Sequence, residues 1–255
     1  MTTTAPEEVV DFHARVLPSA AAVTRLLAEM DRHGIARAVV VAAGAVDLDT
    51  LATQIMEGGF VDVDADNAGL LAVCAESGGR LLPMFFGNPH RPPSEYARVA
   101  AGCYGLELSP AVHGVALTDE RTRAWVEVAG RHGHPVYVVC LGRPGTTAAD
   151  LAVLAREFPD TDFVLGHCGF VGIDVWSVER IRDSPNVFAE TSGCYTRTAA
   201  AAVARLGADR VLFGTEWPLQ DPRVELAKIA ALDLEPDDRR RVLSTNADRL
   251  LRRSS

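Results

Sequence analysis

The sequence predicts a single α/β domain built as a (β/α)8 TIM barrel. Two observations favour this class. Short apolar runs that are typical of buried parallel strands alternate with segments of helical period along the chain, and 255 residues suffice for one such barrel. No linker or low-complexity tract interrupts the alternation, so we expect one domain over residues 1–255. A doubly wound sheet is the alternative α/β arrangement.

Composition and charge restrict the class of protein. Hydrophobic residues make up 48% of the chain and charged residues 23%, as in ordinary soluble globular proteins. The formal charge of −9 argues against a nucleic-acid partner. We find no secretion signal and no apolar run long enough to span a membrane, and the five cysteines lack paired spacing. These features predict a cytoplasmic protein.

The first predicted strand leads to two polar side chains. Residues 9–12 are four strand-tolerant residues between an acidic leader and Pro18, which indicates a buried strand. Residues two apart on a strand point the same way, so we expect His13 and Arg15 to share one face at its carboxyl end. An isolated His-x-Arg would more often be a core histidine followed by a surface arginine.

The next elements continue the alternation. Ser19 can cap a helix that Gly34 ends, and residues 37–42 form an apolar strand. Residues 43–66 are longer than the usual strand-to-helix link, so we expect them to cover a site. Asp66 can cap the helix that follows.

The remaining strands are short apolar runs that end in polar or glycine-rich residues. They are expected at residues 80–86, 104–108, 135–141, 161–165, 186–191 and 210–213. Helical patterns separate them. Thr118 is the expected cap of the helix after the fourth strand, and Asn246 that of the last helix.

Polar groups recur at the same depth of these strands. They are His13 and Arg15 on the first strand, Glu107 on the fourth, Cys140 on the fifth, His167 on the sixth and Glu216 on the eighth. In a barrel the carboxyl ends of the strands converge on one cup, which holds the active site. Chance would scatter such groups, so the pattern predicts a functional His13 and His167.

Several of these runs resemble the amidohydrolase superfamily. The most diagnostic is the eighth-strand run from Arg210 to Pro218; others are residues 10–13, 81–83, 88–89, 165–169, 186–192 and 246–247. Within the superfamily the chain is similar to the branch related to aminocarboxymuconate-semialdehyde decarboxylase. The resemblance implies one divalent metal, usually zinc, and hydrolysis of C–N or C–O bonds or non-oxidative decarboxylation.

The chain departs from the pattern of that family at four places. Arg15 stands where the first strand of the family has the second histidine of His-x-His, and Cys140 stands for a fifth-strand histidine. Glu216 replaces an aspartate that is a metal ligand and often the general acid or base. Residues 105–110 replace the motif Gly-x-Lys-x-His-Pro, whereas the sixth-strand histidine is present as His167.

These departures leave the metal an open question. His13, His167 and Glu216 are enough protein ligands for a catalytic zinc with an open water position, and a Cys140 thiolate would be a fourth. The fixed charge of Arg15 opposes a dication by about 8 kcal/mol at about 4 Å and an effective dielectric of about 20. We therefore expect one divalent metal, zinc by preference, or none.

Without a metal the same groups retain chemical functions. Arg15 could bind a substrate carboxylate through two parallel hydrogen bonds, and Glu107 and Glu216 could divide acid and base roles. His13 or His167 could transfer protons. Cys140 could be a nucleophile if a histidine lowered its pKa, although a small buried packing residue is the simpler interpretation.

Aromatic and histidine side chains follow other strands. Phe170, Tyr195 and Trp217 lie in loops after strands, where they could line an apolar pocket, although plain packing would also explain them. His90 and His113 lie in loops at the same end of the barrel and are candidate substrate contacts.

The sequence therefore predicts a cytoplasmic barrel enzyme for a small-molecule or peptide substrate. Hydrolysis comes first, with Glu216 as general base or acid. The alternatives are a metal-independent decarboxylase, lyase or cyclase that uses Arg15 and the glutamates, and a non-catalytic ligand-binding relative. Members of the family often form dimers, so a homodimer is possible.

Overall fold

A computed structural model describes residues 8–251. The prediction that no secretion signal is present falls on the first residues, which lie outside this range. Within the range, no helix has both the length and the apolar character needed to cross a membrane.

The strands pair in parallel and follow their order in the sequence. Their bounds are β1 Val9–Val16, β2 Ile35–Ala42, β3 Leu81–Pro83, β4 Phe85–Gly87, β5 Leu106–Leu108, β6 Val136–Val138, β7 Phe163–Leu165, β8 Val187–Glu190 and β9 Val211–Leu212. β3 and β4 are two parts of the strand predicted at residues 80–86, interrupted at Met84. Because the Met84 amide donates to the Val40 carbonyl at 2.9 Å and the Phe85 amide to that of Gly105 at 3.0 Å, this strand joins the two sheets.

The first and last strands close the barrel. The Phe12 amide donates to the Phe213 carbonyl at 2.9 Å, and the Glu216 amide donates to the His13 carbonyl at 2.8 Å. These bonds confirm the predicted (β/α)8 barrel rather than the doubly wound sheet. They also place the residues that follow β9 directly beside His13.

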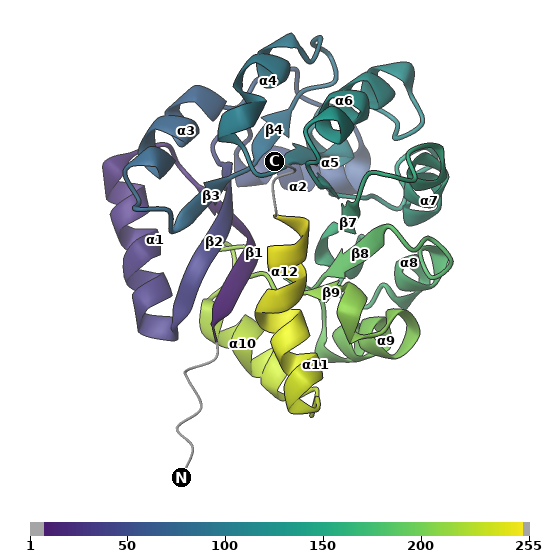
Figure 1. Cartoon of the computed structure of the whole chain (residues 1–255). Helices are drawn as coiled ribbons and strands as arrows, with labels where there is room; N and C mark the ends of the chain where they lie inside the picture. Colours follow the sequence, from purple (N-terminus) through teal and green to yellow (C-terminus); the bar gives the residue numbers. More distant parts are fainter. Residues whose placement is uncertain (1–7, 252–255) are drawn as a thin grey trace.

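The helices surround the strands (Figure 1). Their bounds are α1 Ala20–His33, α2 Leu48–Glu57, α3 Asn67–Ala75, α4 Ser94–Val99, α5 Pro110–His113, α6 Glu120–Arg131, α7 Ala148–Glu157, α8 Val175–Arg180, α9 Thr196–Leu206, α10 Pro222–Ala230, α11 Pro236–Arg240 and α12 Asn246–Leu250. In Figure 1, α12 lies in front of the strands, whereas α2 and α5 lie behind them. The two ends of the barrel are therefore covered by different elements.

The apolar core has two parts, as the alternation of strand side chains requires. Side chains such as Phe12, Val39 and Phe188 fill the barrel, and Ala247 and Leu250 of α12 pack against them. A larger cluster lies between the strands and the outer helices. α12 thus seals the amino-terminal end of the barrel and leaves the carboxyl end for the site.

Three predicted helix boundaries are confirmed. The Ser19 hydroxyl accepts from the Ala22 amide at 3.3 Å, and Gly34 ends α1 with a φ of 68°. The Asp66 carboxylate accepts from the Gly69 amide at 2.8 Å at the start of α3.

Two predicted caps are wrong. Asp119 rather than Thr118 caps α6, because its carboxylate accepts from the Arg121 amide at 2.9 Å. Asn246 lies inside a continuous helical segment, and its amide donates to the carbonyls of Ala208 at 2.7 Å and Val211 at 2.8 Å. The side-chain amide of Asn246 therefore fixes the start of β9. No local capping pattern would indicate this role.

Candidate active site

His13 and Arg15 point into the barrel because β1 is irregular. Val10 and Phe12 face the interior, whereas Ala14 packs toward the outer helices. The register with β2 shifts between Asp11 and Ala14, so the inward face passes from Phe12 to His13 and then to Arg15. The expected shared face of His13 and Arg15 is what the structure shows.

A cluster of four charged side chains lies at this end of β1. His13 Nε2 is 2.8 Å from Glu107 Oε2, and its Nδ1 makes a short hydrogen bond to Glu216 Oε2. Arg15 donates from Nη2 to Glu107 Oε1 at 2.6 Å and from Nε to Glu216 Oε1 at 3.0 Å. Each cation thus bridges both carboxylates.

The cluster determines the protonation of its members. Burial alone would lower the pKa of His13, but the carboxylates of Glu216 and Glu107 raise it to about 10. Burial would raise the pKa of Glu216 and of Glu107, but Arg15 and His13 hold both below the usual 4.5, that of Glu216 far below. An imidazolium and a guanidinium therefore balance two carboxylates.

Asp11 supports the cluster and was not predicted as a site residue. Its Oδ1 accepts from the amides of His13 at 3.1 Å and Thr215 at 2.9 Å, and its Oδ2 accepts from the Thr215 hydroxyl. These bonds hold β1 against the segment after β9. Burial raises the pKa of Asp11 to about 7.

His167 lies beside this cluster. Its Nε2 is 4.0 Å from Glu216 Oε2, and its Nδ1 is 3.0 Å from the Ser192 hydroxyl. Both His167 and Glu216 have positive φ, 60° and 53°. Backbone in this region costs about 1–3 kcal/mol for a residue other than glycine and is concentrated at functional sites.

Three further residues of the site were not predicted. Glu190 accepts hydrogen bonds from the hydroxyls of Tyr137 at 2.7 Å and Ser192 at 2.8 Å, and all three side chains are buried. The sequence does contain an indication of this group. Glu190 is the one acidic residue of an apolar strand, at the strand end, just as Glu107 lies between Leu106 and Leu108.

A cavity of about 500 Å³ opens over these groups. Its polar lining includes Arg15, His167 and Glu216, whereas its walls are mostly apolar side chains, among them Leu48, Leu51, Ile55, Phe86, Val139 and Phe170. Three of these come from α2. The long segment at residues 43–66 therefore covers the site as expected, with a helix inside it.

The predicted substrate contacts have different outcomes. Phe170 lines the cavity, but Trp217, Tyr195, His90 and His113 are absent from its lining. The last two fix the loop that follows α2: His90 Nε2 is 2.7 Å from the His113 carbonyl oxygen, and His113 Nε2 is 3.2 Å from that of Val63. The tyrosine is 63% exposed at the start of α9. Substrate contact by these four is therefore not supported by the geometry.

Cys140 and Glu107 lie differently with respect to the cavity. Cys140 lines the cavity, but burial raises the pKa of its thiol, which opposes a thiolate nucleophile. Glu107 is fully buried, is absent from the cavity lining and contacts both cations. We therefore assign it the neutralisation of His13 and Arg15 rather than proton transfer to a substrate.

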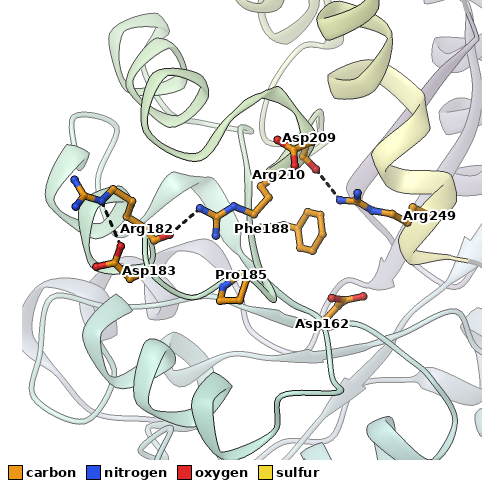
Figure 2. Close-up of a pocket in the computed structure, with 8 residues that line it drawn as sticks. All are labelled: Asp162, Arg182, Asp183, Pro185, Phe188, Asp209, Arg210 and Arg249. Carbon is orange, nitrogen blue, oxygen red and sulfur yellow. Dashed lines mark hydrogen bonds and ion pairs between the residues drawn. The ribbon is translucent and has the colours of Figure 1, made fainter.

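A second cavity, of about 580 Å³, lies at the opposite end of β7, β8 and β9. Figure 2 shows its charged lining. Arg210 donates to the carbonyls of Arg182 at 2.8 Å and Ser184 at 2.7 Å, and Arg249 donates to that of Asp209 at 2.7 Å. These guanidinium groups hold the loops before the strands, so the cavity is part of the scaffold.

A closed barrel with acid–base side chains at the carboxyl ends of its strands defines the class of barrel enzymes. The comparisons narrow this class. The chain belongs to the amidohydrolase family, whose model matches residues 10–253. This confirms the superfamily indicated by the sequence motifs. No curated protein matches the chain in sequence.

Three solved structures show the same fold. A 5-carboxyvanillate decarboxylase from Novosphingobium aromaticivorans, which contains manganese and a nitrobenzoic acid, is 16% identical with a TM-score of 0.72, over 96% of this chain and 97% of that chain. A protein from Pseudomonas putida described as a 2-pyrone-4,6-dicarboxylic acid hydrolase is 20% identical with a TM-score of 0.71, over 97% and 98%. A 2,6-dihydroxybenzoate decarboxylase from Rhizobium is 19% identical with a TM-score of 0.68, over 96% and 98%.

One group among residues 8–251 could hold a divalent cation. Ligand atoms of His13, His167 and Glu216 lie within 4.8 Å of one another. However, both nitrogens of His13 face carboxylates, and Arg15 contacts Glu216. The number of donors is sufficient, but two of the three side chains are already engaged.

Two energetic costs oppose a resident cation. Displacing a proton from His13, whose pKa is about 10, costs about 4 kcal/mol at pH 7. Repulsion by Arg15 adds about 8 kcal/mol for a dication at about 4 Å and an effective dielectric of about 20, of which the attraction of Glu107 and Glu216 offsets a part. The sum is comparable to the roughly 10–16 kcal/mol that a structural zinc gains. Because His13 and Glu216 are engaged with each other, with Glu107 and with Arg15, the residues as arranged do not offer three free ligands to a metal, and we derive no step through one.

Proposed function

We propose that the chain is a metal-independent hydrolase for a small cyclic carboxylate, with His167 as general base and Arg15 as the group that binds a substrate oxygen. The observation that carries this proposal is the 4.0 Å between His167 Nε2 and Glu216 Oε2, beside Arg15 and in the lining of the cavity. Two acceptors at this separation suit a water molecule that donates one hydrogen to each.

His167 rather than Glu216 is the base. Arg15 and His13 hold the pKa of Glu216 far below its usual value, so its carboxylate is a weak proton acceptor. It can still orient the water. The His167 ring accepts the proton as the water oxygen bonds to the acyl carbon of the substrate, and then returns that proton to the departing oxygen or nitrogen. This reverses the predicted priority of Glu216.

Arg15 supplies the positive charge. Its Nε and Nη2 contact the two glutamates, and the side chain is 19% exposed at the cavity. Nη1 has no hydrogen-bond partner among residues 8–251, so it is available for a substrate carboxylate or for the oxygen that gains charge during attack.

The shape and lining of the cavity support a small, flat substrate. About 500 Å³ with mostly apolar walls and charge at one end suits a ring that bears a carboxylate. The names of the similar proteins support the same class, because vanillate, pyrone and benzoate are all carboxylated rings. A long peptide would not fit inside.

Non-oxidative decarboxylation is the second candidate. The apolar walls would desolvate a carboxylate, and two of the three similar proteins are named as decarboxylases. In this reaction a protonated His167 would donate its proton to the ring carbon as the bond to carbon dioxide breaks. The same residues would serve in both reactions, so the product that is formed must distinguish decarboxylation from hydrolysis.

The experiment is to incubate chelator-treated protein with pyrone carboxylates, lactone carboxylates and hydroxybenzoates, and to measure ring opening and carbon dioxide separately. We expect ring opening that survives chelation and falls about 10²-fold or more in His167→Gln. Arg15→Lys should raise KM. His132→Gln, at the opposite end of the barrel, is the matched control.

Carbon dioxide release without ring opening would replace hydrolysis by decarboxylation. Activity that is lost on chelation and restored by zinc would overturn metal independence and support His13, His167 and Glu216 as ligands. Binding of a ring carboxylate without turnover would support the non-catalytic ligand-binding relative.

A further inference from the structure

We propose that Glu190 and Ser192 are positioning residues that keep the proton of neutral His167 on Nδ1, so that Nε2 presents its lone pair to the cavity. The inference rests on the proposed use of His167 as a base. It concerns what keeps Nε2 of this ring unprotonated, which the proposed function assumes without assigning it to any residue.

The direction of one hydrogen bond carries the argument. The Ser192 hydroxyl has one hydrogen, and it donates this hydrogen to Glu190 Oε2 at 2.8 Å. The Ser192 hydroxyl oxygen itself lies 3.0 Å from His167 Nδ1. Because the serine hydrogen is already used, the serine oxygen accepts, and Nδ1 must carry the proton. The tautomer of a histidine is set by the partner of its other nitrogen in this way.

Glu190 is surrounded by donors that keep the serine in this orientation. Its Oε2 also accepts from the Tyr137 hydroxyl at 2.7 Å and from the His167 amide at 3.3 Å, and its Oε1 accepts from the Ser192 amide at 2.5 Å. Burial has the largest effect on the pKa of the Tyr137 hydroxyl, and the charge of Glu190 adds to it. Together they raise this pKa well above 10, so the phenol remains a donor. Glu190 therefore acts only as an acceptor.

Two glycines leave room for this arrangement. A Cβ on Gly214 would lie 2.3 Å from Glu190 Oε1, and a Cβ on Gly166 would lie 2.6 Å from the Tyr137 hydroxyl oxygen. Both distances are far below van der Waals contact. The glycines that precede His167 and Glu216 in the two strand-end runs therefore have a specific function: they admit the carboxylate and phenol that hold the serine.

The neighbouring loop is also fixed. The Lys228 ammonium donates to the carbonyls of Thr191 at 2.6 Å and Cys194 at 2.9 Å, on both sides of Ser192. The serine is thus held by its side chain and by its backbone. Removing its hydroxyl should release the imidazole without moving the loop.

The experiment measures the tautomer directly and needs no substrate. Histidine labelled with ¹⁵N in the full-length protein gives different shifts for protonated and unprotonated ring nitrogens. Loss of one pair of signals in His167→Gln assigns that ring among the seven histidines. We expect the Nδ1–H form in the unsubstituted protein.

Single substitutions distinguish the contribution of Ser192 from that of Glu190. Ser192→Ala should convert the neutral ring largely to the Nε2–H form, and Ser192→Thr, which keeps the hydroxyl, should restore Nδ1–H. Glu190→Ala should give a mixture, because the serine hydrogen is then free. If Glu190→Ala does not fold, Gly214→Ala displaces the same carboxylate. Ser109→Ala, at a serine that lines the cavity, should leave the tautomer unchanged.

The inference is overturned if the unsubstituted protein shows Nε2–H or if Ser192→Ala leaves the tautomer as it was. Measuring turnover distinguishes a failure of this inference from a failure of the proposed function. If the tautomer follows the prediction but His167→Gln keeps full activity, the positioning is correct and the role of His167 as base is wrong. With an active substrate, Ser192→Ala should lower kcat about tenfold or more and change KM little.

Discussion

The ring of Tyr137 lies parallel to the imidazole of His13, with 4.1 Å between ring centroids and 1° between planes. The hydroxyl of the same tyrosine donates to Glu190. One residue of β6 therefore contacts both parts of the site, the charged cluster around His13 and the carboxylate that positions the Ser192 hydroxyl. A change at Tyr137 can remove one contact and keep the other.

Tyr137→Phe keeps the stacked ring and removes the hydroxyl. A buried acceptor then loses one donor, which should lower the free energy of unfolding by about 1–3 kcal/mol. Urea denaturation measures this change. Tyr96→Phe is the matched control, because Tyr96 is also fully buried and its hydroxyl contacts His134 Nδ1 at 2.7 Å, far from Glu190. Both variants should lose stability, but only Tyr137→Phe should alter the ¹⁵N shifts of His167.

Arg15→His should create a metal site. The substitution restores the His-x-His pattern, removes the guanidinium that repels a dication and frees one oxygen each of Glu107 and Glu216. We expect close to one zinc per chain in Arg15→His by elemental mass spectrometry, and less than about a tenth of that in the unsubstituted protein.

Arg15→Gln is the control for this metal prediction, because it removes the charge without adding a ligand atom. It should bind zinc far more weakly than Arg15→His. Stoichiometric zinc in the unsubstituted protein that disappears in His13→Ala would show that the metal-free assignment is wrong.

Stability should fall as the solution becomes alkaline. The pKa of His13 is raised from 6.5 to about 10 in the folded chain, so its stabilising contribution is complete below 6.5 and is lost as the pH rises through about 10. Asp11, whose pKa is raised to about 7, acts in the same direction between 3.8 and about 7. We expect a loss of a few kcal/mol in urea denaturation between pH 6.5 and pH 10.

At acidic pH the stability changes with pH in the opposite direction. The pKa values of Glu107 and Glu216 are lowered from 4.5, so their contribution is present above 4.5 and is lost as the pH falls below it. His13→Asn should flatten the alkaline decline, whereas His132→Asn at the other end of the barrel should not. An equal alkaline decline in His13→Asn and the unsubstituted protein would contradict the assignment.

Arg143→Ala should loosen the helix that covers the cavity. Arg143 donates from Nη1 to the Gln54 carbonyl at 2.9 Å and from Nη2 to the Ile55 carbonyl at 2.6 Å, at the end of α2. Without these bonds, hydrogen exchange in residues 48–57 should become faster, and the affinity for a ring carboxylate should fall several-fold. Arg25→Ala, an exposed arginine of α1, is the control. Unchanged exchange in α2 would show that packing alone holds it.

The strand order and the carboxyl-end positions of the polar groups were predictable from sequence. Apolar runs that alternate with helical patterns specify a parallel barrel, and a barrel brings the ends of distant strands together. For this reason the pattern alone groups His13, Arg15, Glu107, His167 and Glu216, and the family motifs indicate the same group. A closing strand as short as β9 was also recognisable, because its run continues into Glu216.

The pairing of these groups depends on the tertiary structure. A register shift in β1 and the position of β9 beside it determine the contacts of Glu216. They set which of its oxygens meets His13 and which meets Arg15. Glu190 was missed because Tyr137, the partner that marks it as part of a buried network, lies on β6 and is distant in the sequence, although Ser192 is only two residues away. Local patterns encode the direction of a side chain along its own strand, whereas a hydrogen bond requires positions across strands to agree within a few tenths of an ångström. The fold and the location of the site therefore follow from the pattern of the sequence, whereas the closed barrel sets the pairing of the charged groups.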